Sequence, residues 1–97
     1  MKILFIDDIR EPSQYINTNI DSKIFIARNF NEAIKMLEIF TFDIIFFDHD
    51  LGEEKTGYDI AKWIIENNIK INKGFNIISS NSVGRFNISQ LLNHYRI

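Results

Sequence analysis

Residues 42–50 read FDIIFFDHD, and residues 2–8 read KILFIDD. Each stretch is a strongly apolar run that ends in aspartates. Short apolar runs without a clean polar alternation are typical of parallel strands that are buried on both faces. We therefore predict two central strands, over residues 2–6 and 42–47, with acidic residues directly after both.

Strand and helix patterns alternate through the rest of the chain. Residues 22–27 (SKIFIA) and 75–79 are rich in the β-branched and aromatic side chains of strands. Pro12 is tolerated in a first helical turn, so a short or irregular helix is predicted over residues 10–19. Longer helices are predicted over residues 31–40, from about residue 57 to Asn67 and Asn68, and over residues 86–95.

Capping residues and apolar faces support these helices. Asn29 or Asn31 can cap the first long helix, and Thr56 with Asp59 matches the capping-box pattern. The side chains predicted to face the core are Phe30, Ala33, Ile34 and Leu37, then Ile60, Ala61, Ile64 and Ile65, and finally Ile88, Leu91, Leu92 and Tyr95.

This alternation predicts an α/β fold, a small doubly wound parallel sheet of about four strands in the order 2-1-3-4, covered on both faces. Ligands bind such sheets beyond the carboxyl ends of the strands, where the strand order reverses. That point lies between the two strands that end in aspartates, so a functional site is expected there. At least one sheet edge stays exposed, which leaves room for a homodimer.

Length and composition narrow the class of protein. The 97 residues fit one domain over residues 1–97, and a hydrophobic content of 45% supplies a core without disulfides. Because the chain has no Cys and no apolar run of signal-peptide or membrane-span length, we expect a cytoplasmic protein. A net charge of −2 argues against an extended nucleic-acid surface. The richness in Ile, Asn, Lys and Phe suggests an AT-rich bacterial or viral source, and a viral protein would act in the host cytoplasm.

Four aspartates are the candidate metal ligands. Asp7, Asp8 and Asp48 follow neighbouring strands and Asp50 lies just beyond, so at least three carboxylates should converge. Like charges this close together either disfavour ionisation or recruit a cation. Mg²⁺ suits such a cluster, because it prefers a few carboxylates, water and phosphate oxygens. The alternative is that the aspartates are solvated residues that only end the strands.

His49 stands between two of these aspartates. An imidazole that titrates near neutrality could protonate a leaving oxygen, activate water or ligate a metal, so His49 and Asp48 are the candidate catalytic residues. Alternatively, His49 points to solvent or only orients a neighbouring carboxylate. His94 is expected at the surface of the last helix.

The polar turn after residues 75–79 is the candidate phosphate site. Ser79, Ser80 and Asn81 end the strand, and Gly84 and Arg85 precede the predicted helix, so hydroxyls, backbone N–H groups and a guanidinium could all bind phosphate. The alternative is a Ser- and Asn-rich turn that caps a helix.

Two arginines could reach the same edge of the sheet. Arg10 follows the paired aspartates and is the better candidate for binding phosphate. Arg28 follows the strand over residues 22–27, and it either reaches this edge or only pairs with Glu32.

The order of these motifs resembles a response-regulator receiver domain. The resemblance implies that Asp7 and Asp8 bind magnesium, that Asp48 accepts a phosphoryl group, and that Ser79 or Ser80 contacts it. That family also has a lysine after a fifth strand, and this chain has no counterpart.

Nearly the whole chain is similar to the cyclic-phosphate processing receiver-like domain, a distant relative of receiver domains. The stretches FIDDIREP, ARNFNEAI, FFDHDLGEEKTGYDIAKWI and SSNSVGRFNI carry the resemblance. They correspond to the group's DDxRxP, DHDLG with a following GYD, and HSxNPVG motifs. The resemblance implies processing of cyclic phosphates on nucleotides or RNA ends. Ile78 and Ser82 replace the group's His and Pro, which implies weakened catalysis if that His carries a proton.

Three functions are compatible with these residues. The first is a metal-dependent phosphoesterase acting on a cyclic phosphate, with Asp7, Asp8 and Asp48 holding the metal and His49 moving a proton. The second is a non-catalytic binder that sequesters a cyclic nucleotide or another phosphate messenger. The third is a phospho-accepting receiver that acts through a protein partner.

Overall fold

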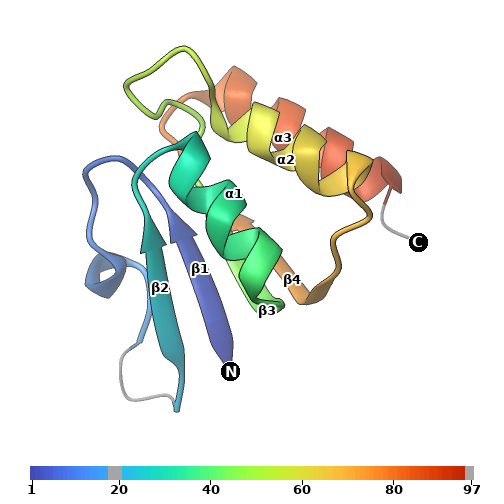
Figure 1. Cartoon of the computed structure of the whole chain (residues 1–97). Helices are drawn as coiled ribbons and strands as arrows, with labels where there is room; N and C mark the ends of the chain where they lie inside the picture. Colours follow the sequence, from blue (N-terminus) through green and yellow to red (C-terminus); the bar gives the residue numbers. More distant parts are fainter. Residues whose placement is uncertain (18–20, 96–97) are drawn as a thin grey trace.

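The computed structural model of the chain describes residues 1–17 and 21–95. Its sheet contains four parallel strands, β1 (Lys2–Ile6), β2 (Lys23–Ala27), β3 (Phe42–Phe47) and β4 (Ile71–Ile77), in the order β2-β1-β3-β4 (Figure 1). The predicted fold class and strand order are confirmed.

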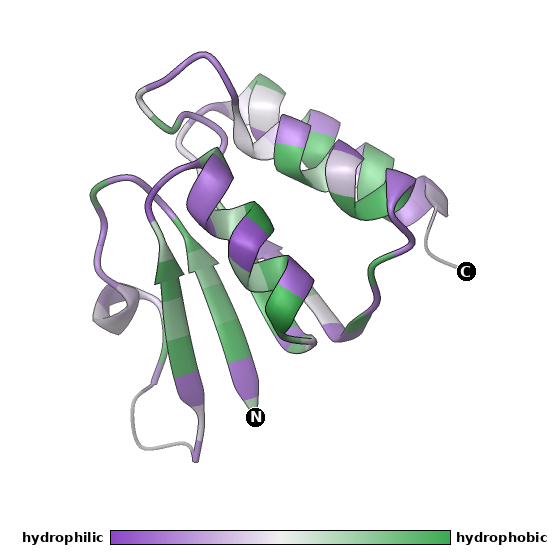
Figure 2. Cartoon of the chain, viewed as in Figure 1, coloured by the Kyte–Doolittle hydropathy of each residue, from purple (hydrophilic) through white to green (hydrophobic). Residues whose placement is uncertain are grey.

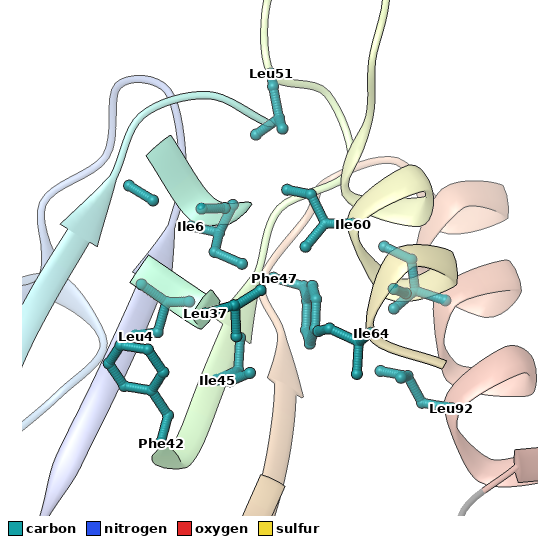
Figure 3. Packing of buried hydrophobic residues seen from close by; sticks show 14 residues of the cluster. Leu4, Ile6, Leu37, Phe42, Ile45, Phe47, Leu51, Ile60, Ile64 and Leu92 are labelled. Atoms are coloured by element: carbon teal, nitrogen blue, oxygen red, sulfur yellow. The ribbon is translucent and has the colours of Figure 1, made fainter. Parts of the chain in front are cut away.

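The helices α1 (Phe30–Ile39), α2 (Gly57–Glu66) and α3 (Ser82–Tyr95) pack on one face of this sheet (Figure 1). Leu4 and Phe47 point to that face from the two central strands and contact a core that includes Leu37 of α1, Ile64 of α2 and Leu92 of α3 (Figure 3). Because protein interiors are close-packed, this core fixes the strand ends relative to the helices.

The second face of the sheet is covered differently from the prediction. Its apolar side chains include Ile3, Phe5 and Phe46, and they pack against Ile16 in the connection between β1 and β2. The described part of that connection contains a 3₁₀ turn, Pro12–Gln14, in place of the helix predicted over residues 10–19, of which residues 18 and 19 lie outside the described residues. Before Pro12, the Asp7 carboxylate accepts hydrogen bonds from the backbone amides of Ile9 and Arg10, and this turn keeps the residues before Pro12 out of a helix.

Two elements also start earlier than predicted, and β4 ends at Ile77 rather than at residue 79. β4 begins at Ile71 rather than Phe75, because pairing with β3 recruits residues of low strand propensity, among them Gly74 at φ 151°. α3 begins at Ser82 rather than Phe86, because Asn81 caps it: its Oδ1 accepts a 3.0 Å hydrogen bond from the Gly84 amide.

Helix caps were predicted well, and one core assignment was wrong. Asn29 Oδ1 accepts the Glu32 amide at the start of α1, and Thr56 and Asp59 form the predicted capping box of α2. Tyr95 was predicted to face the core, but it is 56% exposed near the end of α3. Ile88 and Leu92 of α3 are buried as predicted.

Strand register brings the polar residues after the strands to one edge. The backbone amide of Asp7 donates to Ala27 O (3.1 Å), that of Asp48 donates to Ile6 O (2.9 Å), and that of Ile78 donates to Phe47 O (2.9 Å). The parallel ladder therefore continues one residue beyond β1, β3 and β4. Residues that are distant in sequence become neighbours at the carboxyl end of the sheet.

Hydropathy follows this arrangement (Figure 2). Strands β1 and β2 are largely hydrophobic, whereas the loops at the carboxyl end of the sheet are largely hydrophilic. None of the helices in residues 1–17 and 21–95 combines the length and apolar character needed to cross a lipid bilayer.

Candidate functional site

Three carboxylates converge at the carboxyl ends of β1 and β3. One oxygen from each of Asp7, Asp8 and Asp48 lies within 4.8 Å of the other two. Asp7 is fully buried (0% exposed) and Asp48 nearly so (5%). The predicted convergence of at least three carboxylates is therefore present in the structure, and the metal ligation itself stays a prediction.

Burial has an electrostatic consequence at Asp48. Loss of water contact raises the pKa of its carboxyl group, the charge of Asp7 raises it further, and the Arg10 guanidinium opposes the shift. The ionised cluster thus holds negative charge that its surroundings compensate only in part. A cation near these oxygens would stabilise the charged form.

Asp7 shapes the loop that follows β1. Its Oδ1 accepts hydrogen bonds from the backbone amides of Ile9 (3.0 Å) and Arg10 (2.8 Å), which makes a tight Asx-type turn. The turn directs the Arg10 side chain back over the carboxylate of Asp7. One aspartate therefore serves both as part of the cluster and as the organiser of the loop.

The Arg10 guanidinium lies on the cluster. Its Nη1 is 3.3 Å from Asp7 Oδ2 and 3.6 Å from Asp48 Oδ1, and it donates to the backbone oxygen of Ile78 at 3.3 Å. Arg10 thus connects the ends of β1, β3 and β4. It is at the predicted edge of the sheet, and its role in binding phosphate stays a prediction.

Arg28 braces the same loop from the end of β2. Its Nη1 donates to the backbone oxygens of Asp7 (3.2 Å) and Arg10 (2.7 Å), and its Nη2 pairs with Glu11 Oε1 at 3.0 Å. The alternative that Arg28 only pairs with Glu32 was wrong, because Glu32 accepts from the backbone amide of Arg28 instead. Sequence reasoning missed this bracing role, although the position of an arginine at the end of a strand beside the site was the available signal.

His49 and Asp50 form a second polar group with Asn81. His49 Nδ1 is 3.0 Å from Asp50 Oδ1, and Asn81 Nδ2 is 3.4 Å from both His49 Nδ1 and Asp50 Oδ2. The hydrogen bond from His49 lowers the pKa of Asp50, and Asn81 adds to this effect. Asp50 therefore lies outside the three-carboxylate group and contacts the imidazole instead.

Two glycines allow the close approaches that build this edge. A Cβ atom on Gly57 would lie 1.9 Å from the backbone oxygen of Asp48, and one on Gly84 would lie 2.3 Å from Cγ of the His49 ring. Gly84 was predicted to precede the last helix, but it lies in the first turn of α3 and packs against His49. Sequence alone offers no way to see which side chain needs that space.

The other candidate phosphate ligands surround the start of α3. Ser79 is buried (3% exposed), and its Oγ accepts the backbone amide of Asn81 at 3.0 Å. Ser80 is exposed in the turn, and Arg85 is exposed on α3 rather than before it. The turn caps α3, as the alternative interpretation predicted. Phosphate binding by these residues stays a prediction.

One comparison with known proteins gives a family. The model of the family described as the cyclic-phosphate processing receiver domain matches residues 2–94, nearly the whole chain. No curated protein matches the sequence.

Proposed function

Since this chain belongs to the family of cyclic-phosphate processing receiver domains, we propose that it hydrolyses a cyclic phosphate on a nucleotide or an RNA end with the help of a divalent metal ion. The observation that carries this proposal is the cluster of Asp7, Asp8 and Asp48, whose oxygens lie within 4.8 Å of one another beside the Arg10 guanidinium. Metal-assisted hydrolysis of a phosphate ester needs carboxylates that hold the metal ion and a cationic side chain that binds the phosphate.

The donor set fits a hard cation such as Mg²⁺. All three groups are carboxylates, Asp7 and Asp48 are held by the sheet, and the raised pKa of Asp48 reflects first its burial and then the charge of Asp7. Mg²⁺ typically binds to a few carboxylates and completes its shell with water and phosphate oxygens. When bound, it would polarise a phosphoryl oxygen and lower the pKa of a water molecule.

The remaining polar groups suit the substrate. Arg10 would pair with a phosphoryl oxygen, and the turn of Ser79, Asn81, Gly84 and Arg85 would offer hydrogen bonds at the start of α3. In the reaction, a water oxygen bonds to phosphorus while one ester P–O bond of the ring breaks. The water loses a proton and the leaving ester oxygen gains one, so the product is an open phosphate monoester.

His49 is the group we assign to this proton transfer. Its Nδ1 lies against Asp50 at 3.0 Å, a contact that orients the ring and favours the proton on Nδ1. Nε2 is then the ring nitrogen that can exchange a proton with water or with the leaving oxygen. Asp50 and Gly84 would hold the imidazole in place.

A second function is favoured by Ile78. At this position the related motif has a histidine, whereas the Ile78 side chain packs with the apolar residues of the second sheet face. An aliphatic side chain cannot transfer a proton. If that step is required, the same site would bind a cyclic nucleotide or a similar phosphate messenger without turnover.

Phosphorus NMR separates the two functions. The protein is incubated with 2′,3′- and 3′,5′-cyclic nucleotides, with Mg²⁺ and again with EDTA. New monoester resonances that require the metal and vanish in Asp48→Asn would support the phosphoesterase, and would identify its substrate class. Broadened substrate resonances without product would support the binder, and turnover that is equal in Asp48→Asn would rule out the proposed metal site.

A further inference from the structure

Arg10 and a metal ion would bind to the same two carboxylates, those of Asp7 and Asp48. Nη1 of Arg10 lies 3.3 Å from Asp7 Oδ2 and 3.6 Å from Asp48 Oδ1, and both aspartates belong to the three-carboxylate group. Two cations this close would repel each other strongly at the low effective dielectric of a partly buried site. Repulsion between the two cations would favour movement of the guanidinium away from these carboxylates when a metal ion binds.

The loop allows the side chain to move without the backbone. The Arg10 amide is held by Asp7 Oδ1 at 2.8 Å, and its carbonyl oxygen is held by Arg28 Nη1 at 2.7 Å. The Arg10 side chain, in contrast, is 28% exposed and ends in contacts of 3.3 Å or longer. Rotation of the side chain toward solvent would break these longer contacts and keep the backbone hydrogen bonds of Arg10.

We propose that the Arg10 side chain, whose backbone is held in place, leaves the carboxylates of Asp7 and Asp48 when a divalent metal ion binds there. The guanidinium then pairs with the phosphate of the ligand. This inference rests on the proposed function, since it uses the same metal site. It adds an order to binding: the metal releases the guanidinium, and phosphate gives the guanidinium a new partner. Metal and phosphate therefore bind cooperatively through Arg10.

Two consequences distinguish this role from a purely structural one. Removing the charge of Arg10 removes a competitor, so Arg10→Met should bind metal more tightly than the wild-type protein. Phosphate should tighten metal binding in the wild-type protein and do so much less in Arg10→Met. An arginine that only stabilised the fold would produce neither effect.

The test is calorimetric titration with Mn²⁺ alone, followed by titration in the presence of inorganic phosphate. Arg10→Met is compared with the wild-type protein and with Lys35→Met, which removes one positive charge from an exposed position on α1. We expect the dissociation constant for Mn²⁺ to fall by about tenfold or more in Arg10→Met, because a nearby positive charge is lost. Lys35→Met should bind Mn²⁺ as the wild-type protein does.

A measurement on the wild-type protein covers the case in which Arg10→Met fails to fold. The ¹⁵N resonance of the Arg10 Nε should shift when Mg²⁺ is added and shift again with phosphate. An unchanged resonance on a protein that binds Mg²⁺ would overturn the exchange.

The outcomes also separate this inference from the proposed function. If the wild-type protein binds Mn²⁺ and Arg10→Met binds it equally or more weakly, the exchange is wrong while the metal site stands. If neither protein binds Mn²⁺, the metal site is wrong and the exchange is wrong with it. Tighter binding in Arg10→Met, with the loss of phosphate coupling, would support both.

Discussion

Gly84 packs so closely on His49 that a Cβ atom at residue 84 would lie 2.3 Å from Cγ of the imidazole. The first turn of α3 therefore forms one wall of the His49 position. Asp50 and Asn81 contact the same ring, at 3.0 and 3.4 Å from Nδ1. Helix α3 and the turn that caps it thus both take part in orienting the histidine.

Gly84→Ala should displace His49 and weaken any reaction that depends on it. The methyl group meets the ring itself, so we expect at least a tenfold loss of turnover and a destabilisation of about 1–3 kcal/mol from overpacking. Turnover and the His49 ring resonances in ¹H–¹⁵N NMR would be measured together. Val83→Ala, at the exposed neighbouring position, serves as the control. Normal His49 resonances in Gly84→Ala would show that the contact is unimportant.

Asp48→Asn should change the pH dependence of stability in EDTA. Burial raises the pKa of Asp48 above its ordinary value of 3.8, and the charge of Asp7 adds to the shift. The folded protein therefore binds this proton more tightly than the unfolded chain. The resulting stabilisation is complete below the unfolded pKa and is lost as pH rises through the folded pKa.

The test is urea unfolding of both proteins in EDTA from about pH 3.5 to about pH 7, a range that spans the expected titration. The difference in free energy of unfolding should move in favour of Asp48→Asn as pH rises. Adding Mg²⁺ at neutral pH should stabilise the wild-type protein and leave the variant largely unchanged. A difference that stays constant with pH would contradict the assigned shift.

Arg28→Met should loosen the loop that carries Asp7 and Arg10. The substitution removes the hydrogen bonds to two backbone oxygens and the pair with Glu11, so we expect a loss of about 1–3 kcal/mol in the free energy of unfolding. Metal affinity should fall as well, because the cluster loses its fixed geometry. Arg28→Lys should recover only part of both, since an ammonium lacks the planar fork of donors. Equal behaviour of the Lys and Met variants would mean that the fork geometry is irrelevant.

Ile78→His tests why the related motif carries a histidine. The residue directly follows β4, and its backbone oxygen already accepts from Arg10. An imidazole here adds a proton-transfer group at the carboxyl end of β4, so turnover of a cyclic phosphate should rise about tenfold or more. Ile78→Asn, polar but unable to titrate, is the matched control. No gain in the His variant, with its fold intact by circular dichroism, would show that Ile78 does not limit turnover.

Local signals in the sequence predicted most of the elements. The apolar runs over residues 2–6 and 42–47 are strands with those bounds, and the capping box of Thr56 and Asp59 starts α2 as predicted. These features depend on residues close in sequence. Local propensity was misleading where pairing with a neighbouring strand determines the secondary structure, as at the early start of β4.

For this protein, the sequence alone determined that aspartates follow two adjacent parallel strands, and therefore that carboxylates meet at one edge of the sheet. Only the tertiary structure decided which groups contact one another. Asp50 contacts His49, and Arg10 lies on Asp7 and Asp48. Gly84 leaves the space that the imidazole occupies. The reason is physical, since strand ends are positioned by backbone periodicity, whereas side-chain partners depend on close packing between elements that are distant along the chain.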